Sequence, residues 1–422
     1  MSKPPLERRL LPDTSRVTSD DIFVGGVSLV EIADTYGTPV FVYDEETLRA
    51  RAAEAATVFD EGTAFASKSF LCIAMARLAV EEGLCIDVST AGELDIVLRA
   101  GVPADRIIVH GNNKSREELE RAVDIKVRRL IVDNFDEIKN LAELVSLTRP
   151  LDVMLRVIPG VEAHTHEYIQ TGQEDSKFGL SLSRGDADEA MAQLSLIAGV
   201  KVRGVHVHIG SQILDVESFV KSLEIIRTFV ARHELGEVCI GGGLGVAYHA
   251  DEIAPPLREW GERVRAAARE VLGESVVITA EPGRAITATA GLTLYRVGAR
   301  KDVDARTYLA VDGGMSDNPR PILYGARYEA VRVQQPEATR DGCFRIVGKH
   351  CESGDVIIDE AWLPAATAAG DLIATPVTGA YGYSMASNYN RVPKPAVVFV
   401  RNGVARLVVR RETLDDLARL DV

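Results

Sequence analysis

The sequence has few cysteines and none of the spacings that cysteine chemistry requires. Five cysteines are spread over 422 residues, and none of them forms a C-x-x-C pair: Cys72, Cys85, Cys239, Cys343 and Cys351. An odd number of widely separated cysteines argues against a disulfide framework and against a zinc site. We therefore expect free thiols, no metal centre and a reducing, cytoplasmic environment.

Long apolar runs and basic patches are also missing. No run is long enough to cross a bilayer, and the first twenty residues lack the apolar core of a signal peptide. The net charge of −14 would repel nucleic acids and anionic membranes. We expect partners that are small molecules, with neither nucleic acid nor membrane among them.

The sequence does contain a regular alternation of short apolar runs with helix-sized segments. Eight such runs occur, at residues 64–68, 86–89, 107–110, 130–133, 153–157, 205–208, 238–241 and 276–281. This alternation predicts parallel strands covered by helices, in a closed (β/α)8 TIM barrel or in an open doubly wound sheet. The barrel is favoured because polar residues follow the carboxyl ends of several strands, where barrel enzymes carry their chemistry.

Beyond Gly291 the pattern changes to short strand-like pieces separated by Gly, Asp and Pro. Such pieces are typical of an all-β domain. Residues 1–20 are polar and predict a loosely ordered arm, whereas 38–44 predict a strand that joins the β-domain. The predicted domains are an arm and strand at 1–42, a barrel at 43–290 and a C-terminal β-domain at 291–422.

Lys68 is the first candidate for chemistry, because it ends the apolar run Phe65-Ala66-Ser67-Lys68. An amine in apolar surroundings loses its proton readily and can attack a carbonyl group to form a Schiff base. The alternative is a lysine whose charged end reaches solvent at the end of a strand. The residues described next decide between these interpretations.

Two loops predict an anion site. Gly241-Gly242-Gly243 follows the seventh predicted strand, and Glu281-Pro282-Gly283-Arg284 follows the eighth. Consecutive glycines let the backbone N–H groups surround an anion, and these two loops commonly bind phosphate in TIM barrels. A simple tight turn is the alternative for the glycines.

His206 and His208 alternate on the sixth predicted strand and should point to the same side. Metal ligation, stacking on an aromatic ring and a hydrogen-bonded core position are all open to them. Glu281 at a strand end would suit a protonated ring nitrogen. Together with Lys68 and the glycine loops, these residues predict a pyridoxal 5′-phosphate site.

Seven motifs extend this interpretation, and through them the chain closely resembles the diaminopimelate decarboxylases. This family belongs to the alanine-racemase-like group of pyridoxal-phosphate enzymes, which combine a barrel with a β-domain. The motifs begin at Phe65, Thr171, His208, Gly241, Glu281, Cys351 and Gly379, and read FASK, TGQEDSKFG, HIGSQ, GGGLG, EPGR, CESGD and GAYG. The resemblance covers nearly all of residues 23–400.

The resemblance implies a role for each matching residue. Lys68 would carry the cofactor, His208 would stack on its ring and Glu281 would face its nitrogen. Its phosphate would be held by Ser211, Gly241, Gly242, Gly243, Gly283 and Arg284, and Tyr381 would reach both that phosphate and the substrate. Pro282 would also line the cofactor site. The far end of the substrate would be bound by Arg284, Arg320, Tyr324, Glu352 and Tyr381. Cys351 would be the proton donor, supplied by the partner subunit of a homodimer whose active sites are shared across the interface.

The implied reaction is the decarboxylation of meso-2,6-diaminopimelate to L-lysine, the last step of lysine biosynthesis. A substrate with an amino-acid group at each end needs a second carboxylate and ammonium site, which an arginine and a glutamate can supply. One alternative is a related decarboxylase for ornithine, arginine, carboxynorspermidine or a carrier-bound amino acid. The other is an inactive regulatory binder, which would not need Lys68 or Cys351.

Overall fold

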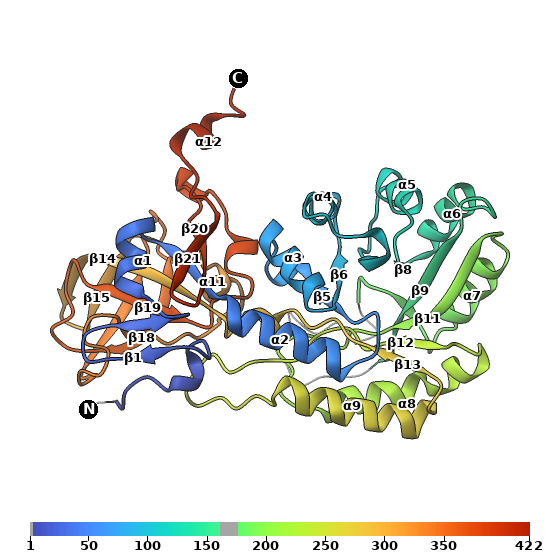
Figure 1. The fold of residues 1–422 in the computed structure, drawn as a ribbon, viewed down its shortest axis with the longest axis horizontal. Coiled ribbons are helices and arrows are strands. Elements are labelled where there is room, and N and C mark those ends of the chain that lie inside the picture. Colours follow the sequence, from blue (N-terminus) through green and yellow to red (C-terminus); the bar gives the residue numbers. More distant parts are fainter. Residues whose placement is uncertain (1–2, 161–175) are drawn as a thin grey trace. The chain divides into compact units, whose positions relative to one another are not determined.

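A computed structural model describes residues 3–160 and 176–422 (Figure 1). The chain forms two compact units. The barrel unit comprises Arg51–Gly245 and Ala254–Ala285, and the β-unit comprises Met1–Ala50, Val246–Ile253 and Ile286–Val422. The start of the Thr171–Gly179 motif lies outside the described residues, and Ser176–Gly179 lie inside them.

The barrel unit contains the eight parallel strands that the sequence predicted. They are β5 (Ala64–Ala66), β6 (Cys85–Val88), β7 (Ile107–Val109), β8 (Arg129–Val132), β9 (Leu151–Ile158), β11 (Val200–His206), β12 (Glu237–Cys239) and β13 (Val277–Thr279). Each strand pairs with its neighbours in sequence order, and the short β10 (Leu180–Ser181) adds to β9. The Ala64 N–H donates to the Ala280 carbonyl at 2.9 Å, so the first strand meets the end of the last one. The prediction of a barrel is confirmed.

Helices surround these strands on the outside (Figure 1). They are α3 (Ile73–Glu81), α4 (Ala91–Arg99), α5 (Arg116–Ile125), α6 (Phe135–Leu144), α7 (Asp186–Ser195), α8 (Glu217–Arg232) and α9 (Leu257–Leu272). The local sequence Ser115-Arg116-Glu117-Glu118 predicts a capping box, and it is present: the Ser115 and Glu118 side chains each accept from the other residue's backbone N–H at the start of α5. Trp260 on α9 is fully buried and contacts Phe59 and Phe219 edge-on, which fixes α9 against the barrel.

The β-unit is built on one large sheet. Its strand order is β18 (Val356–Leu363), β17 (Gly342–Val347), β15 (Arg306–Val311), β14 (Gly291–Val303), β4 (Val40–Asp44), β20 (Ala396–Arg401) and β21 (Val404–Val409), with β19 (Leu372–Pro376) on β14 and β16 (Val331–Arg332) on β19. β4 pairs with β14 and β20, so the predicted contribution of the N-terminal strand is confirmed. The sequence did not predict β16, β18 or β19.

A small sheet and short helices complete the β-unit. The sheet contains β1 (Arg16–Val17), β2 (Ile22–Val24) and β3 (Val27–Ser28), and it leads into α1 (Leu29–Tyr36). α2 (Glu45–Val58) begins in the β-unit and continues into the barrel unit. α10 (Arg284–Thr287), α11 (Arg320–Tyr324) and α12 (Leu414–Ala418) follow later in the chain.

The N-terminal arm is not loosely ordered, which corrects the prediction from its polarity. Leu10 is fully buried among core residues of the β-unit. The Arg9 guanidinium donates to the carbonyls of Ala250 and Glu252, and Lys3 bridges to Arg340. One apolar anchor and a few long-range hydrogen bonds therefore hold a segment that composition alone describes as exposed.

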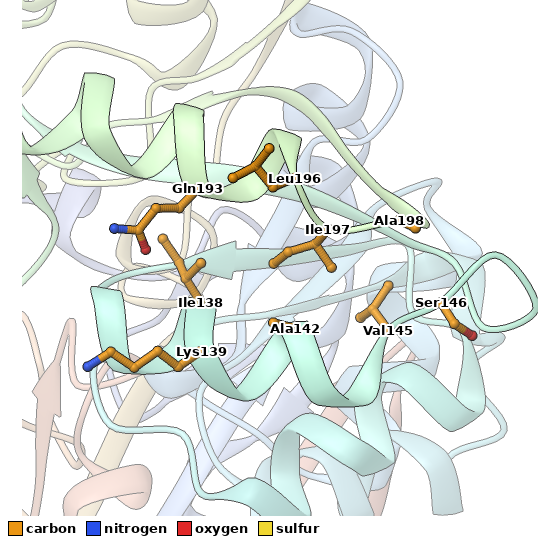
Figure 2. A pocket seen from close by; sticks show the side chains of 9 residues that line it. All are labelled: Ile138, Lys139, Ala142, Val145, Ser146, Gln193, Leu196, Ile197 and Ala198. Atoms are coloured by element: carbon orange, nitrogen blue, oxygen red, sulfur yellow. The ribbon is translucent and has the colours of Figure 1, made fainter.

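A shallow apolar depression of about 410 Å³ lies outside the strands, between α6 and α7 (Figure 2). It is lined mainly by aliphatic side chains, among them Ile138, Val145, Leu196 and Ile197. None of the predicted site residues lines it. Within the described parts of the chain, no helix has the length and apolar character needed to cross a membrane.

Gly204 offers a test of the barrel's strand packing. A Cβ at this position would lie 1.7 Å from the Glu237 carbonyl oxygen on the neighbouring strand, beside the irregularity in the β9–β11 pairing. We expect Gly204→Ala to destabilise the protein by about 1–3 kcal/mol, or to prevent folding, because the backbones must separate. Gly236→Ala is the control, since no atom lies within 4 Å of its added Cβ. Equal unfolding midpoints for the two variants would contradict this packing.

Candidate active site

Lys68 lies on a short 3-10 turn, Ser67–Ser69, directly after β5. Its neighbours Ser67, Ser69 and Phe70 are buried, whereas its own side chain is exposed. The structure thus places the amine at the carboxyl end of the first barrel strand, as predicted. The apolar surroundings that the sequence predicted extend over the rest of the run, since Phe65, Ala66 and Ser67 are buried, but they do not enclose the Lys68 side chain itself.

The two predicted anion loops meet in the barrel unit. The Glu281 N–H donates to the Gly241 carbonyl at 2.8 Å. A Cβ at Gly242 would lie 2.4 Å from the Glu281 carbonyl oxygen, and one at Gly243 would lie 2.4 Å from the Gly210 carbonyl oxygen. No residue larger than glycine fits at either position without moving the backbone. The loops after β11, β12 and β13 therefore converge.

The loop after β13 also reaches the turn that carries Lys68. A Cβ at Gly283 would lie 2.9 Å from Ser69 Oγ and 3.0 Å from the Ala66 carbonyl oxygen. Pro282 and Arg284 on either side of Gly283 are buried. The last strand of the barrel therefore brings its loop against the first strand, which joins Lys68 to the glycine loops.

Glu281 is held by two histidines from other strands. Its Oε1 atom lies 2.8 Å from His110 Nε2, and its Oε2 atom lies 2.8 Å from His206 Nε2. His110 follows β7 and His206 ends β11, and both rings are buried with their centroids 4.8 Å apart. Of the interpretations open for His206, the hydrogen-bonded buried position is the one observed.

The charges around Glu281 keep it ionised. Burial by itself would raise the pKa of the carboxyl, but the positive charge of His110 and the hydrogen bonds from His110 and His206 hold that pKa well below its usual range. Burial lowers the pKa of His110, and the carboxylates of Asp87 and Glu281 more than offset this, so that its pKa is raised. The pKa of His206 is lowered to about 4, chiefly by burial.

His208 lies two residues beyond the end of β11 and is partly exposed. A Cβ at Gly241 would lie 2.9 Å from His208 Nδ1, so the ring sits directly against the first glycine of the β12 loop. Burial, followed by the charges of Lys68 and Arg156, lowers the pKa of His208 well below its usual value. The ring is therefore neutral near pH 7. Ser211, three residues after His208 in the loop that follows β11, is half-buried.

Arg320 opens helix α11 in the β-unit and is buried. Its guanidinium lies 4.3 Å from the ring centroid of Tyr248 and donates to the Tyr328 hydroxyl at 2.5 Å. Such a stacked and hydrogen-bonded fork is fixed in orientation, which suits recognition of a carboxylate. Tyr324 lies four residues later, at the end of the same helix. Arg320 is therefore a buried residue, although the turn-forming sequence around it, Asp317-Asn318-Pro319-Arg320-Pro321, is also compatible with a surface arginine.

Cys351 and Glu352 lie on an exposed loop between β17 and β18 of the β-unit. Both side chains are exposed, and the Cys351 thiol is free. A Cβ at Gly354 would lie 2.9 Å from Ile322 on α11, so this loop packs against the helix that starts at Arg320. The β-unit thus brings the loop with Cys351 and Glu352 against the helix with Arg320 and Tyr324, about thirty positions earlier in the sequence.

Tyr381 belongs to the same unit and has a left-handed backbone, with φ of 65°. This conformation is unusual for a residue with a large side chain and is typical of functional positions. The side chain is half-buried and packs against the core cluster that contains Tyr248 and Tyr328. These two tyrosines around Arg320 were not predicted, because nothing in their local sequence marks them.

His110, Asp87 and Arg156 are the barrel residues that the prediction of site roles omitted. His110 and Arg156 fall within the predicted strand runs 107–110 and 153–157 but received no role there, and Asp87 sits inside the buried strand β6. The ligand atoms of His110, His206 and Glu281 lie within 4.8 Å of one another. Hydrogen bonds to Glu281 account for this grouping without an ion, and the absence of a metal centre stays a prediction.

The five cysteines are free thiols in the structure. Cys72, Cys85 and Cys239 are buried, whereas Cys343 and Cys351 are exposed. Burial and the nearby Glu281 charge raise the pKa of Cys239 well above its ordinary value, so this thiol stays protonated beside the carboxylate. The expectation of free thiols is confirmed.

Comparison with known proteins identifies a matching family model and similar sequences. Residues 45–288 match the family model for the pyridoxal binding domain of pyridoxal-dependent decarboxylases. The diaminopimelate decarboxylase of Bacillus subtilis (strain 168) is 46% identical over 420 residues, which cover 94% of each chain. That of Mycobacterium tuberculosis (strain ATCC 25618 / H37Rv) is 42% identical, with 97% of each chain covered.

Solved structures agree with these relatives. The diaminopimelate decarboxylase of M. jannaschii in complex with L-lysine superposes with a TM-score of 0.90, at 30% identity over 97% of this chain and 98% of that one. A lysine/ornithine decarboxylase from Vibrio vulnificus, with a TM-score of 0.75 and 22% identity, shares the fold. From the family model and the relatives together, this chain belongs to the pyridoxal-dependent decarboxylases, within the diaminopimelate decarboxylase family.

Proposed function

We propose that this protein decarboxylates meso-2,6-diaminopimelate to L-lysine with pyridoxal 5′-phosphate as its cofactor. The observation that carries the proposal is the convergence of the Lys68 turn, the glycine loops and the buried Glu281 in one unit. The substrate is inferred from the relatives, which bear the name diaminopimelate decarboxylase. The last step of lysine biosynthesis is the corresponding place in metabolism.

The residues of the barrel unit fit this cofactor. A Cβ at Gly241, Gly242, Gly243 or Gly283 would lie 2.4–2.9 Å from another protein atom, so only glycine lets the loops after β11, β12 and β13 approach one another as closely as a shared anion site requires. Ser211, Arg284 and Tyr381 would complete the phosphate site, and Pro282 would line the cofactor beside them. Lys68 would anchor the cofactor, His208 would stack on its ring and Glu281 would hold a proton on its ring nitrogen.

When bound, pyridoxal phosphate supplies an electron sink for the pair released as a carboxylate leaves as carbon dioxide. The chain's own residues select which carboxylate leaves. Arg320, with Arg284 and Tyr324, would bind the carboxylate at the far end, and Glu352 would pair with the ammonium there. Cys351 would then donate a proton to the carbon that has lost its carboxylate. Tyr381 would contact both substrate and cofactor.

We also propose a cytoplasmic homodimer in which each active site takes residues from both chains. The exposed positions of Cys351 and Glu352 in a single chain support this arrangement, because a proton donor must be shielded when it acts. Free thiols suit a reducing compartment. Residues 43–290 would form the cofactor-binding domain, with 1–42 and 291–422 supplying the β-domain.

The substrate assignment can be tested with Arg320. The purified protein, loaded with cofactor, should release carbon dioxide from meso-diaminopimelate in preference to ornithine and arginine. Arg320→Ala should raise KM for diaminopimelate about tenfold to a hundredfold, because a buried charge-assisted hydrogen bond is lost. Arg306→Ala, an exposed arginine of the same unit, is the control. Faster turnover of ornithine by the wild type, or an unchanged KM in Arg320→Ala, would reject the assignment.

Lys68→Ala tests the cofactor anchor. Loss of the amine should abolish turnover and the visible absorbance of protein-bound pyridoxal phosphate, since the covalent attachment point is gone. Lys139→Ala on α6 is the control and should retain both. A bound chromophore that survives in Lys68→Ala would show that another amine is the anchor.

The shared site can be tested by mixing inactive variants. Lys68→Ala and Cys351→Ala should each be nearly inactive alone, with Cys351→Ala reduced about 10²- to 10⁴-fold. Refolding or exchange of the mixture should restore roughly a quarter of the wild-type activity, because half of the dimers would contain one intact site. Cys343→Ala, another exposed thiol, should stay active. No recovery in the mixture, despite subunit exchange, would place Lys68 and Cys351 in the same chain's site.

A further inference from the structure

His110 and His206, which both form hydrogen bonds with Glu281, have a role beyond packing the barrel interior. Each occupies a different carboxylate oxygen, and they come from strands β7 and β11, to either side of β8 and β9 in the sheet order. A carboxylate bound at both oxygens cannot rotate about its terminal bond without losing a hydrogen bond. The two oxygens carry four lone pairs between them, so the carboxylate keeps acceptor capacity beyond the two histidines and the neighbouring Cys239 thiol. Glu281 is therefore oriented before any ligand arrives.

The two histidines differ in their surroundings. Asp87 Oδ1 lies 3.8 Å from His110 Nε2, so a second carboxylate stands beside that ring. His206 Nδ1 is buried and has no hydrogen-bond partner. A ring with one nitrogen facing a carboxylate and the other facing nothing polar is stable as the neutral form with hydrogen on Nε2. His110 is thus the charged donor to Glu281, and His206 is the neutral one.

A contribution to folding stability does not explain the buried cluster of Glu281, His110, His206 and Asp87. Burying four ionisable side chains at one point costs desolvation energy, and an apolar set of similar volume is often as stable or more so. Other polar or ionisable groups of the described residues also face the cluster: Arg156 on β9, Cys239 on β12, Glu93 on α4, Lys68 and His208. A cluster in which neighbouring charges shift the pKa of one group is typical of a functional site.

We propose that His110 and His206 are positioning residues, which together hold the Glu281 carboxylate ionised and aimed at the cofactor's ring nitrogen. His206 sets the orientation through a neutral hydrogen bond. His110, with Asp87 behind it, supplies the positive charge that keeps Glu281 an anion inside the barrel. This inference rests on the proposed function, in which Glu281 faces that nitrogen.

The orientation role can be tested with two variants of His206. In His206→Gln the amide N–H can replace Nε2–H, whereas His206→Leu has no donor. We expect His206→Leu to bind pyridoxal phosphate about tenfold to a hundredfold more weakly than the wild type, and His206→Gln to recover most of that loss. The measurements are the dissociation constant of the cofactor and the unfolding midpoint of each loaded protein. Equal losses in both variants, or none in either, would overturn this role.

The charge role of His110 predicts a pH dependence. In the wild type the lowered pKa of Glu281 keeps it ionised well below neutral pH. His110→Gln retains a donor but removes the charge, so burial should raise the pKa of Glu281. Cofactor affinity and the bound absorbance should then fall from about pH 8 to about pH 6 in His110→Gln, while the wild type stays level. Identical profiles for the two proteins would overturn the charge role.

The control for both tests is His233→Gln. His233 lies 2.7 Å from Asp188 on the outer helices, in the same kind of contact, and should leave cofactor binding unchanged. All of these readouts concern cofactor binding and need no substrate. A wild type that binds cofactor but fails to decarboxylate diaminopimelate would refute the proposed function alone. An active wild type with unaltered His110 and His206 variants would refute this inference alone.

Discussion

The geometry of the barrel unit depends on one constraint, that the carboxyl ends of parallel strands in a closed barrel all face the same rim. Eight loops therefore start from one side, and residues far apart in sequence meet there. The contacts of Gly283 with Ala66 and Ser69 show the closure directly, because the last strand's loop touches the first strand's turn. Without closure, the Lys68 turn and the Glu281 loop would be at opposite edges of an open sheet.

Within that rim, Glu281 is the electrostatic centre. A lone buried carboxylate would take up a proton, whereas the paired histidines hold this one ionised. The pKa of the neighbouring Asp87 shifts in the opposite direction. It rises to about 6, because burial and the Glu281 charge raise it by more than the His110 charge lowers it. One histidine charge between two carboxylates thus stabilises Glu281 more than Asp87, and the difference follows from the hydrogen bond that only Glu281 receives.

The β-unit holds the Arg320 guanidinium in a fixed direction and leaves the Cys351 thiol accessible. Arg320 is stacked on Tyr248 and bonded to Tyr328, so little of its side-chain entropy remains to be lost on binding a carboxylate. Cys351 and Glu352 lie on an exposed loop that packs on the same helix. Rigid support and exposed reactive groups are thereby combined in one short stretch of structure.

The sequence by itself determined the eight barrel strands, the capping box at Ser115 and the positions of Lys68 and Glu281 at strand ends, because these depend on local periodicity and side-chain type. Its local pattern did not reveal the burial of the N-terminal arm, the exposure of Lys68, or the partners of Glu281 and Arg320. Apart from the hydrogen bond between Arg320 and Tyr328, eight residues apart, those features depend on the packing of segments separated by tens to hundreds of residues. Only the closed barrel and the β-unit core bring such segments together, and the tertiary structure alone decides them.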